Sequence, residues 1–245
     1  MSSFVGTAHR VYVGPLDLSG LASHVDFGQS SRSMEPCTTF NDGGFNCVKP
    51  GMISGSGMVD GYQDYATGVL DDTISIGSMG SQYAMTVIPA TGTVAAADPC
   101  WFSRGLIGSL NPLDGAKGQM GEFHLGLNFD TTMLRGFVGA PKATVVANTT
   151  GTAVAMTGPS ATQRLYAWVH VFAYSGFTNV VFTVETDDAV GFPSATTRLT
   201  FTTVTGLTSE FASVTGGFAT ETHARIVATK TGAGSITYAA GFGVL

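Results

Sequence analysis

Charged side chains are scarce in this sequence, since Asp, Glu, Lys and Arg make up 11% of its 245 residues, against roughly 25% in an average soluble domain. Glycine, by contrast, occurs 33 times. A surface with few charges does little to prevent strand edges from pairing with other molecules. We therefore expect much of this surface to be covered in an assembly.

Clusters of basic residues are also lacking, and the charge is unevenly divided along the chain. Residues 1–138 hold six Lys or Arg and twelve Asp or Glu, whereas residues 139–245 hold five of each kind. The whole net charge of −6 therefore belongs to the first half. Tight binding to nucleic acid needs a patch of Lys and Arg that neutralises phosphates. The isolated basic residues here argue against it.

The sequence has no long apolar run. Its longest apolar stretch, residues 165–174, is interrupted by His170 and is too short to cross a bilayer. The N-terminal residues lack the basic and then apolar pattern of a signal peptide. We expect a protein without a membrane span that is made in a cytoplasm.

Cysteine is rare, and its three residues are Cys37, Cys47 and Cys100. Their number is odd, and their spacing is not that of a metal site. In a reducing compartment they would remain thiols, and free cysteines are usually buried as small apolar side chains. The sequence leaves open whether Cys37 and Cys47 pair.

Catalytic and metal-binding patterns are absent as well. The five histidines stand far apart, without the spacing that places two metal ligands on one face of an element. No Gly-x-Ser-x-Gly turn is present. The adjacent acids Asp71-Asp72 and Asp187-Asp188 fit turns at strand ends better than a calcium loop, which needs further oxygen ligands. We predict no enzymatic activity, no cofactor and no metal site.

What the sequence does have is a two-residue hydrophobic period, which indicates β-strands. The clearest strand is the last, where one face carries Ile236, Tyr238, Ala240, Phe242 and Val244. Small residues, Thr and Gly dominate residues 141–164, so we place a domain boundary near residue 139. The pattern predicts an all-β chain of two domains, residues 1–139 and residues 140–245, the second an antiparallel β-sandwich.

The first half is less regular. Strands are expected near residues 11–13, 52–58, 74–76, 83–88 and 121–129. Residues 61–70 instead carry apolar side chains at helical spacing after a capping Asp60, and this predicts a short amphipathic helix. The dipeptide Asp98-Pro99 suggests a second brief helix.

Residues 28–50 read as a long loop with three apolar side chains, Met34, Phe40 and Phe45. A long loop inside a compact domain usually has a function, and apolar residues on it suggest that a neighbour covers them. We interpret these three as candidates for a contact between subunits. The alternative is that the loop folds back on its own domain.

Several short motifs follow one another in a recognisable order. They are Pro-Leu-Asp-Leu-Ser-Gly-Leu at residues 15–21, Thr-Thr-Phe at 38–40, Lys-Pro-Gly at 49–51, Val-Glu-Thr-Asp-Asp at 184–188 and Arg-Leu-Thr-Phe at 198–201. In this order they resemble the major tail tube proteins of long-tailed, siphovirus-type phages that infect actinobacteria. The resemblance covers most of the chain.

The resemblance implies a tail-tube-type β-sandwich or barrel with one short α-helix in the first domain, whose copies join edge to edge into stacked rings. Hexameric rings are favoured, and trimeric rings are possible. The implied partners are copies of the chain itself, the tape measure protein and other tail proteins, and DNA would pass through the tube without specific binding. The implied location is the phage tail of the virion, with the second domain outer or wall-forming.

The acidic first half fits such a lumen, because a negative wall repels phosphates and leaves the duplex hydrated. Candidate lumenal acids come from expected strands and their ends. They are Asp17, Asp26, Asp60, Asp71, Asp72, Glu122 and Asp130.

Two alternatives of a different class remain. Tyr166, Trp168 and Phe172 share one face of an expected strand, and an exposed aromatic face would suit a carbohydrate-binding module. That reading fails if this face packs in a core. The second alternative is a capsid decoration protein, which would form monomers or trimers on an icosahedral shell.

Overall fold

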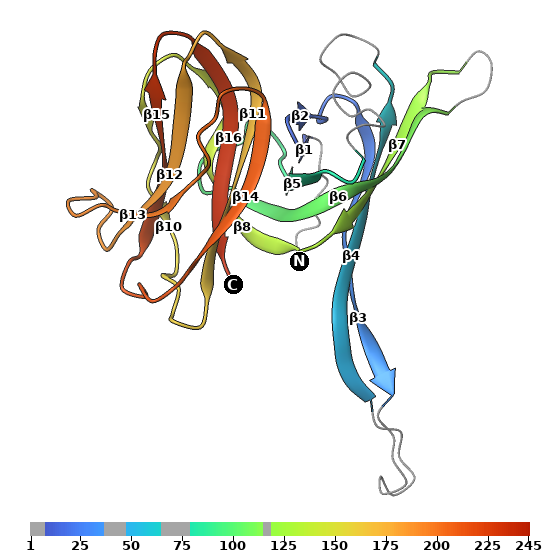
Figure 1. The fold of residues 1–245 in the computed structure, drawn as a ribbon, viewed down its shortest axis with the longest axis horizontal. Helices are drawn as coiled ribbons and strands as arrows, with labels where there is room; N and C mark the ends of the chain where they lie inside the picture. The colour runs from blue at the N-terminus through green and yellow to red at the C-terminus, as the bar shows by residue number, and fades with distance from the viewer. Residues whose placement is uncertain (1–7, 37–47, 65–78, 115–118) are drawn as a thin grey trace, which may run out of the picture.

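The computed structural model describes residues 8–36, 48–64, 79–114 and 119–245, with the backbone alone described at 28–36, 48–53 and 112–113. These residues form sixteen β-strands and no helix (Figure 1). The strand pairs are antiparallel, which confirms the all-β class expected from the two-residue period. In the part of the chain that is described, no helix is long and apolar enough to cross a membrane.

Eight strands precede residue 146. They are β1 to β8, at Arg10–Val13, Leu16–Asp17, Ala22–Pro36, Val48–Tyr62, Gln82–Ile88, Pro99–Asp114, Glu122–Phe129 and Leu134–Val145. The other eight, β9 to β16, lie at Thr149–Thr150, Val154–Ala155, Arg164–Ser175, Asn179–Asp187, Thr196–Thr200, Thr208–Thr215, His223–Thr231 and Ser235–Val244.

One large sheet connects the two halves of the chain. Its main path runs β14-β11-β16-β8-β6-β5-β1-β2, and it branches at β6 into β7, β4 and β3. The boundary expected near residue 139 lies inside β8, which pairs with β6 near its start and with β16 along the rest of its length. A smaller sheet, in the order β10-β15-β12-β13 with β9 on β15, covers the second half.

Each half nevertheless has a core of its own. In the second half, alternate residues of β12 such as Phe182 and Val184 pack against β11 and β16 of the large sheet. In the first half, the large sheet curls so that Val11 of β1 and Val59 of β4 meet Leu125 of β7 in one core. The expected sandwich of the second half is therefore present, and its inner sheet continues into the first half.

The final strand differs from expectation on one face. Ile236, Tyr238 and Phe242 are buried against the smaller sheet, as predicted. Ala239, on the opposite face, is also buried, because that face packs against the first half. The expected half-buried strand is thus the middle layer of the molecule.

Residues 28–50 were expected to form a loop, and this was wrong for the described part. β3 and β4 pair from Ala22–Gly61 to Pro36–Val48 as one long hairpin that projects from the body (Figure 1). Residues 28–33 and 54–57 are mostly Ser and Gly, so the sequence shows no hydrophobic alternation there, whereas Val25 and Val59 of the same hairpin pack in the first core. Residues 37–47, including Phe40 and Phe45, lie outside the described residues.

Neither helix prediction is supported where it can be examined. Gly61 and Tyr62 end β4, and Gln63 and Asp64 follow without helical structure. Pairing of β4 with both β3 and β7 overrides the helical spacing of these side chains; residues 65–70 lie outside the described part. At Pro99 the chain enters β6, and the carboxylate of Asp98 accepts the N–H of Ala95 in a turn instead of capping a helix.

Candidate assembly surface

The strands β3, β4, β7 and β6 form a four-stranded branch of the large sheet with two open edges. Within the described residues β3 pairs only with β4. At the other side, β5 pairs with β6 only as far as Leu106, so the described strands leave one side of β6 uncovered from Gly108 to Asp114. Open strand edges present unpaired N–H and C=O groups that readily accept another strand.

The two faces of this branch differ in chemistry. One face carries the apolar residues of the first core, including Val59 and Leu125, which are directly paired. We call the opposite face the polar face. It includes His24, Asp26, Ser56, Met58, Asp60, Tyr62, Leu106, Ser109, Asn111, Asp114, Glu122, His124, Gly126 and Asn128.

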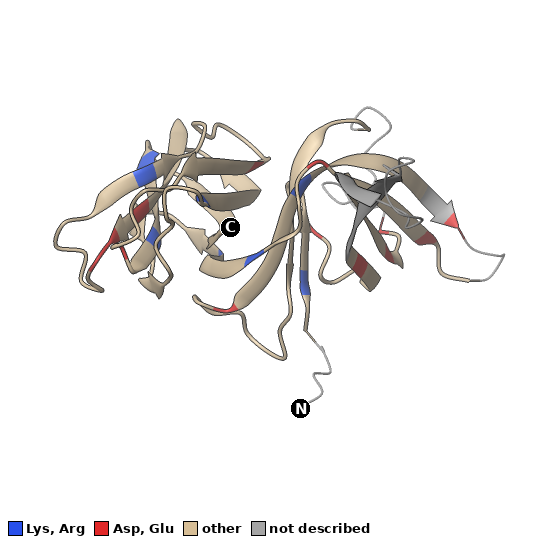
Figure 2. Cartoon of the chain, turned by 90° about the horizontal axis from the view of Figure 1, so that it is seen from below, with Lys and Arg blue, Asp and Glu red and all other residues tan. Residues whose placement is uncertain are grey.

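The polar face is acidic. Asp26, Asp60, Asp114 and Glu122 lie on it, and no Lys or Arg does among its described positions. Figure 2 shows the same distribution, with red and no blue on the strands farthest from the second half, apart from the segments drawn in grey. Arg104 lies where β6 leaves this face, and its Nε binds the Asp130 carboxylate at 2.9 Å.

A hydrogen-bonded row crosses the polar face from one open edge to the other. His24 Nδ1 on β3 lies 3.3 Å from Asp60 Oδ2 on β4, and His124 Nδ1 on β7 lies 2.8 Å from Asp60 Oδ1. His124 Nε2 then lies 3.4 Å from Asp114 Oδ2 on β6. The hydrogen bond that His124 donates to Asp60, assisted by the charges of Asp60 and Asp114, raises the pKa of His124. We call these four residues the His–Asp row.

The structure brings together some of the predicted lumenal acids and separates others. Asp26, Asp60 and Glu122 share the polar face. Asp17 lies elsewhere, where its Oδ2 is 2.6 Å from Lys142 Nζ. Asp130 forms an ion pair with Arg104 and accepts a hydrogen bond from Gln82 Nε2 at 2.9 Å.

The remaining predicted site residues fall on parts of the chain that are incompletely described. Asp71 and Asp72 lie outside the described residues, together with Phe40 and Phe45. Met34 pairs with Pro50 in the backbone of the hairpin. Sequence reasoning missed Asp114, His24 and His124, because only the register of the strands brings them into one row.

The face proposed for sugar binding is covered. Trp168 of β11 is fully buried, and Tyr166 and Phe172 pack against the same cluster, which joins the two halves of the chain. The Phe172 ring lies 4.9 Å from that of Tyr12, and Phe102 lies 6.4 Å from Trp168. These three aromatics therefore form no exposed platform.

His170 lies inside this junction and is buried. Its Nδ1 is 2.7 Å from the carbonyl oxygen of Gly14, and its Nε2 is 2.9 Å from the hydroxyl of Thr86. Burial lowers the pKa of His170 to about 4, so the imidazole is neutral. A carbonyl can only accept, so Nδ1 carries the hydrogen and Nε2 accepts from Thr86. The ring thus connects β11 to two segments of the first half.

Other candidate groups have structural roles. Cys100 is buried, as expected, and burial raises its thiol pKa to about 12. Asp187 ends β12 and accepts the N–H groups of Ala189 and Ser194, which fits the predicted turn. No group of three or more His, Cys, Asp or Glu in the described part of the chain is arranged to hold a metal ion.

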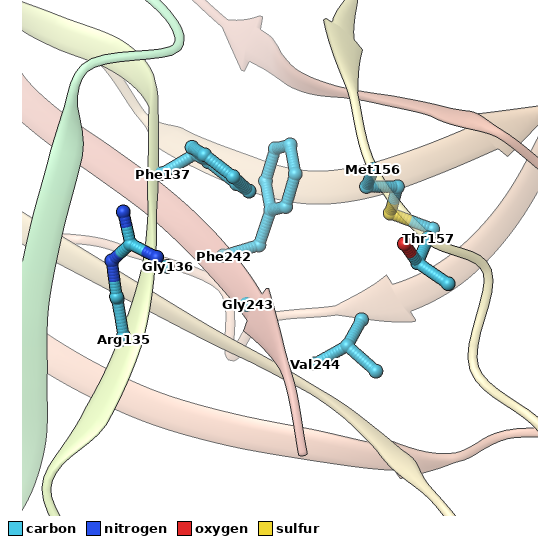
Figure 3. Close-up of a pocket in the computed structure, with 8 residues that line it drawn as sticks. All are labelled: Arg135, Gly136, Phe137, Met156, Thr157, Phe242, Gly243 and Val244. Atoms are coloured by element: carbon cyan, nitrogen blue, oxygen red, sulfur yellow. The ribbon is translucent and has the colours of Figure 1, made fainter.

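A cavity of about 310 Å³ opens between β8, the end of β16 and the segment after β10 (Figure 3). Phe137, Met156 and Val244 give it apolar walls, and the Arg135 guanidinium lies at one side. None of the described residues that line it is a carboxylate, an imidazole or a thiol. Its one hydroxyl is that of Thr157, and no described lining residue is a base that could activate it.

No protein family model and no curated protein matches the chain. Among solved structures, the chain is similar to SPP1 Dit (gp 19.1), described as a paradigm of the hub adsorption apparatus in phages infecting Gram-positive bacteria. The TM-score is 0.36 and the identity 9%, over 97% of this chain and 99% of that one. The chain is also similar to a chain of the phage p2 baseplate in its activated conformation with Sr. The TM-score is 0.30 and the sequence identity 9%, over 95% of this chain and 97% of that one. Likeness at this level does not assign a family.

Proposed function

We propose that this chain is a structural protein of a phage tail that self-associates through its four-stranded branch into rings, and that the rings stack into the tail tube. The observation that carries the proposal is a sheet with one acidic face and with two edges that no other described strand covers along β3 and along the end of β6. The motif order of the sequence, which resembles that of tail tube proteins, supports the same role.

The geometry of the branch suits ring closure. Its strands alternate in direction, so β6 runs opposite to β3. A second copy that places its β3 against β6 therefore continues the antiparallel ladder. Barrels of 16–18 strands already leave an aqueous channel. A hexamer contributing four strands per copy would build a barrel of about 24 strands, with a wider channel.

The polar face would line this channel. A wall with Lys or Arg would exchange counterions with duplex DNA and hold it, whereas carboxylates repel phosphates. The acidic polar face therefore fits a tube through which DNA passes without specific binding. In this arrangement residues 1–139 form the ring and lumen, and residues 140–245 form the outer wall. Other tail proteins, including the tape measure protein, would be its partners in the virion.

Electron microscopy of the purified protein tests the proposal. We expect rings and stacked tubes, and a reconstruction should place Asp60 and Glu122 on the lumen. A lumen lined by Lys and Arg, or by the second half alone, would contradict the assignment. If the protein forms single rings that never stack, the proposed tube would be refuted, and the proposal would be reduced to a ring in the phage tail. Persistent monomers, or trimers that form neither closed rings nor tubes, would favour the capsid decoration protein instead.

A further inference from the structure

A second cleft, of about 320 Å³, opens where the two halves of the chain meet. Its polar lining comes mainly from β1, β2 and β8, outside the four-stranded branch. It consists of Arg10, Tyr12, Asp17 and Lys142, with Thr93 from the segment between β5 and β6. The volume lies at the lower end of the range of small-molecule sites. We call this space the junction cleft.

The strands bring these polar groups together. Arg10 and Tyr12 are two residues apart on β1, so their side chains lie on one face of the sheet. Asp17 is directly paired with Tyr12 and therefore shares that face. Lys142 reaches the same place from β8, since its Nζ lies 2.6 Å from Asp17 Oδ2. The cleft thus gathers two cations, one carboxylate and one phenol, and its net charge is positive.

The carboxylate in the cleft is already satisfied within the chain. Asp17 Oδ1 accepts the N–H of Ser19 at 3.0 Å and also the Ser19 hydroxyl, and Oδ2 pairs with Lys142. Burial favours a higher pKa for Asp17, but the hydrogen bonds from Lys142 and Ser19 outweigh burial and hold the pKa below its ordinary value. Asp17 therefore stays ionised and compensates the charge of Lys142. The charge of Arg10 is left uncompensated.

Two groups in the cleft have no partner in the part of the chain that the structure describes. None of the described carboxylates forms an ion pair with Arg10. Tyr12 is 1% exposed, and its hydroxyl has no hydrogen-bond partner among the described residues. Burial, assisted by the charge of Asp17, raises the pKa of Tyr12 despite Arg10, so the hydroxyl keeps its hydrogen. A buried donor without a partner is costly, and in native structures a bound water or ion usually explains it.

We propose that the junction cleft binds an oxyanion, either a phosphate or a carboxylate group. The Arg10 guanidinium supplies the charge and a planar pair of N–H donors, which match two oxygens of either group. The Tyr12 hydroxyl and a further N–H of the Lys142 ammonium donate additional hydrogen bonds. A metal cation would instead meet uncompensated positive charge. An anion bound here would connect β1 to β8.

Titration with inorganic phosphate tests the site, and acetate is the carboxylate probe. The backbone amide resonances of Thr93 and Lys142 should shift and reach saturation, with a dissociation constant on the order of 1 mM. Arg10→Gln should weaken binding by about tenfold or more, because it removes a charge-assisted hydrogen bond. As a matched control, Arg164→Gln removes the same charge from an arginine at the start of β11, outside the cleft, and should leave binding unchanged.

The variant Tyr12→Phe separates ligand binding from packing. It should weaken phosphate binding by about tenfold, because one hydrogen bond to a charged group is lost. Without phosphate, the melting temperature of this variant should equal or exceed that of the wild type, because the hydroxyl has no partner in the described chain to lose. A lower melting temperature would show that the hydroxyl is bound within the protein and would overturn its role as a donor.

Assembly distinguishes two sources of the anion. If an acidic side chain of a second copy fills the cleft, saturating phosphate should raise the protein concentration needed for half-assembly by about threefold, the range of an exposed ion pair. Arg10→Gln should raise it by a similar factor. If a free anion fills the cleft, phosphate should leave that concentration unchanged or lower it.

Two results would overturn the site. Resonances that shift with neither probe would exclude it, and equal losses of affinity in Arg10→Gln and Arg164→Gln would leave an adventitious ion only. The proposed ring would survive either result, because its edges β3 and β6 lie outside the junction cleft. If the protein forms no rings, the proposed function fails, and the titration still decides whether the cleft binds an anion.

Discussion

The buried histidine at the junction makes a quantitative prediction about pH. Burial holds the pKa of His170 at about 4, against 6.5 for an ordinary histidine. Because the unfolded chain binds a proton in this interval and the folded chain does not, the free energy of unfolding falls as the pH falls from about 6.5 to about 4. At 1.36 kcal/mol per pKa unit, the full loss is about 3 kcal/mol.

The effect of His170 is best measured at pH values above those at which carboxylates titrate. Between about pH 7 and about pH 5, His170 alone should lower the free energy of unfolding by about 2 kcal/mol. Asp17 and Glu221, whose hydrogen bonds hold their pKa values below the ordinary range, stay ionised there. His124 acts in the opposite sense, because its raised pKa adds stability at low pH that is lost as the pH rises through the folded value.

Comparison with a variant removes the contribution of His124. The free energy of unfolding can be measured by guanidinium denaturation of the monomer, followed by the fluorescence of the buried Trp168. Between about pH 7 and about pH 5 it should fall by about 2 kcal/mol more in the wild type than in His170→Gln. Equal slopes in wild type and His170→Gln would refute the assignment of a neutral, buried imidazole.

Four further substitutions probe Phe40 and Phe45, the aromatic junction around Trp168, and the ion pair between Lys142 and Asp17. Phe40→Ala and Phe45→Ala should reduce polymerisation, measured by sedimentation, more than they lower the melting temperature of the monomer; equal losses would place both rings in the core of one subunit. Trp168→Ala should lower the free energy of unfolding by about 3–5 kcal/mol, and a loss below about 1 kcal/mol would show that the junction packs loosely. Lys142→Ala should cost about 1 kcal/mol or less, because its partner Asp17 is half-buried but the ammonium is more than a third exposed; a stability independent of salt would contradict an ionic contact.

Local pattern was enough to predict the fold class. The alternation in β12 and β16 depends on neighbours two residues apart, so it survives in a single sequence, and both strands form where it indicates. Composition likewise placed the net charge in the first half, where Asp26, Asp60 and Glu122 share a face. Local pattern failed at residues 61–64, since pairing on both sides of β4 outweighs a helical spacing of side chains.

The candidate site depended on tertiary structure. His24 and Asp60 are 36 residues apart, and Asp60 and His124 are 64 apart, so no local pattern connects them. Strand register alone decides which side chains lie opposite one another, and a shift by one residue would turn each to the other face. The same holds for His170, which looks like an interruption in an apolar run. Only the fold places the Gly14 carbonyl and the Thr86 hydroxyl within hydrogen-bonding distance of its ring.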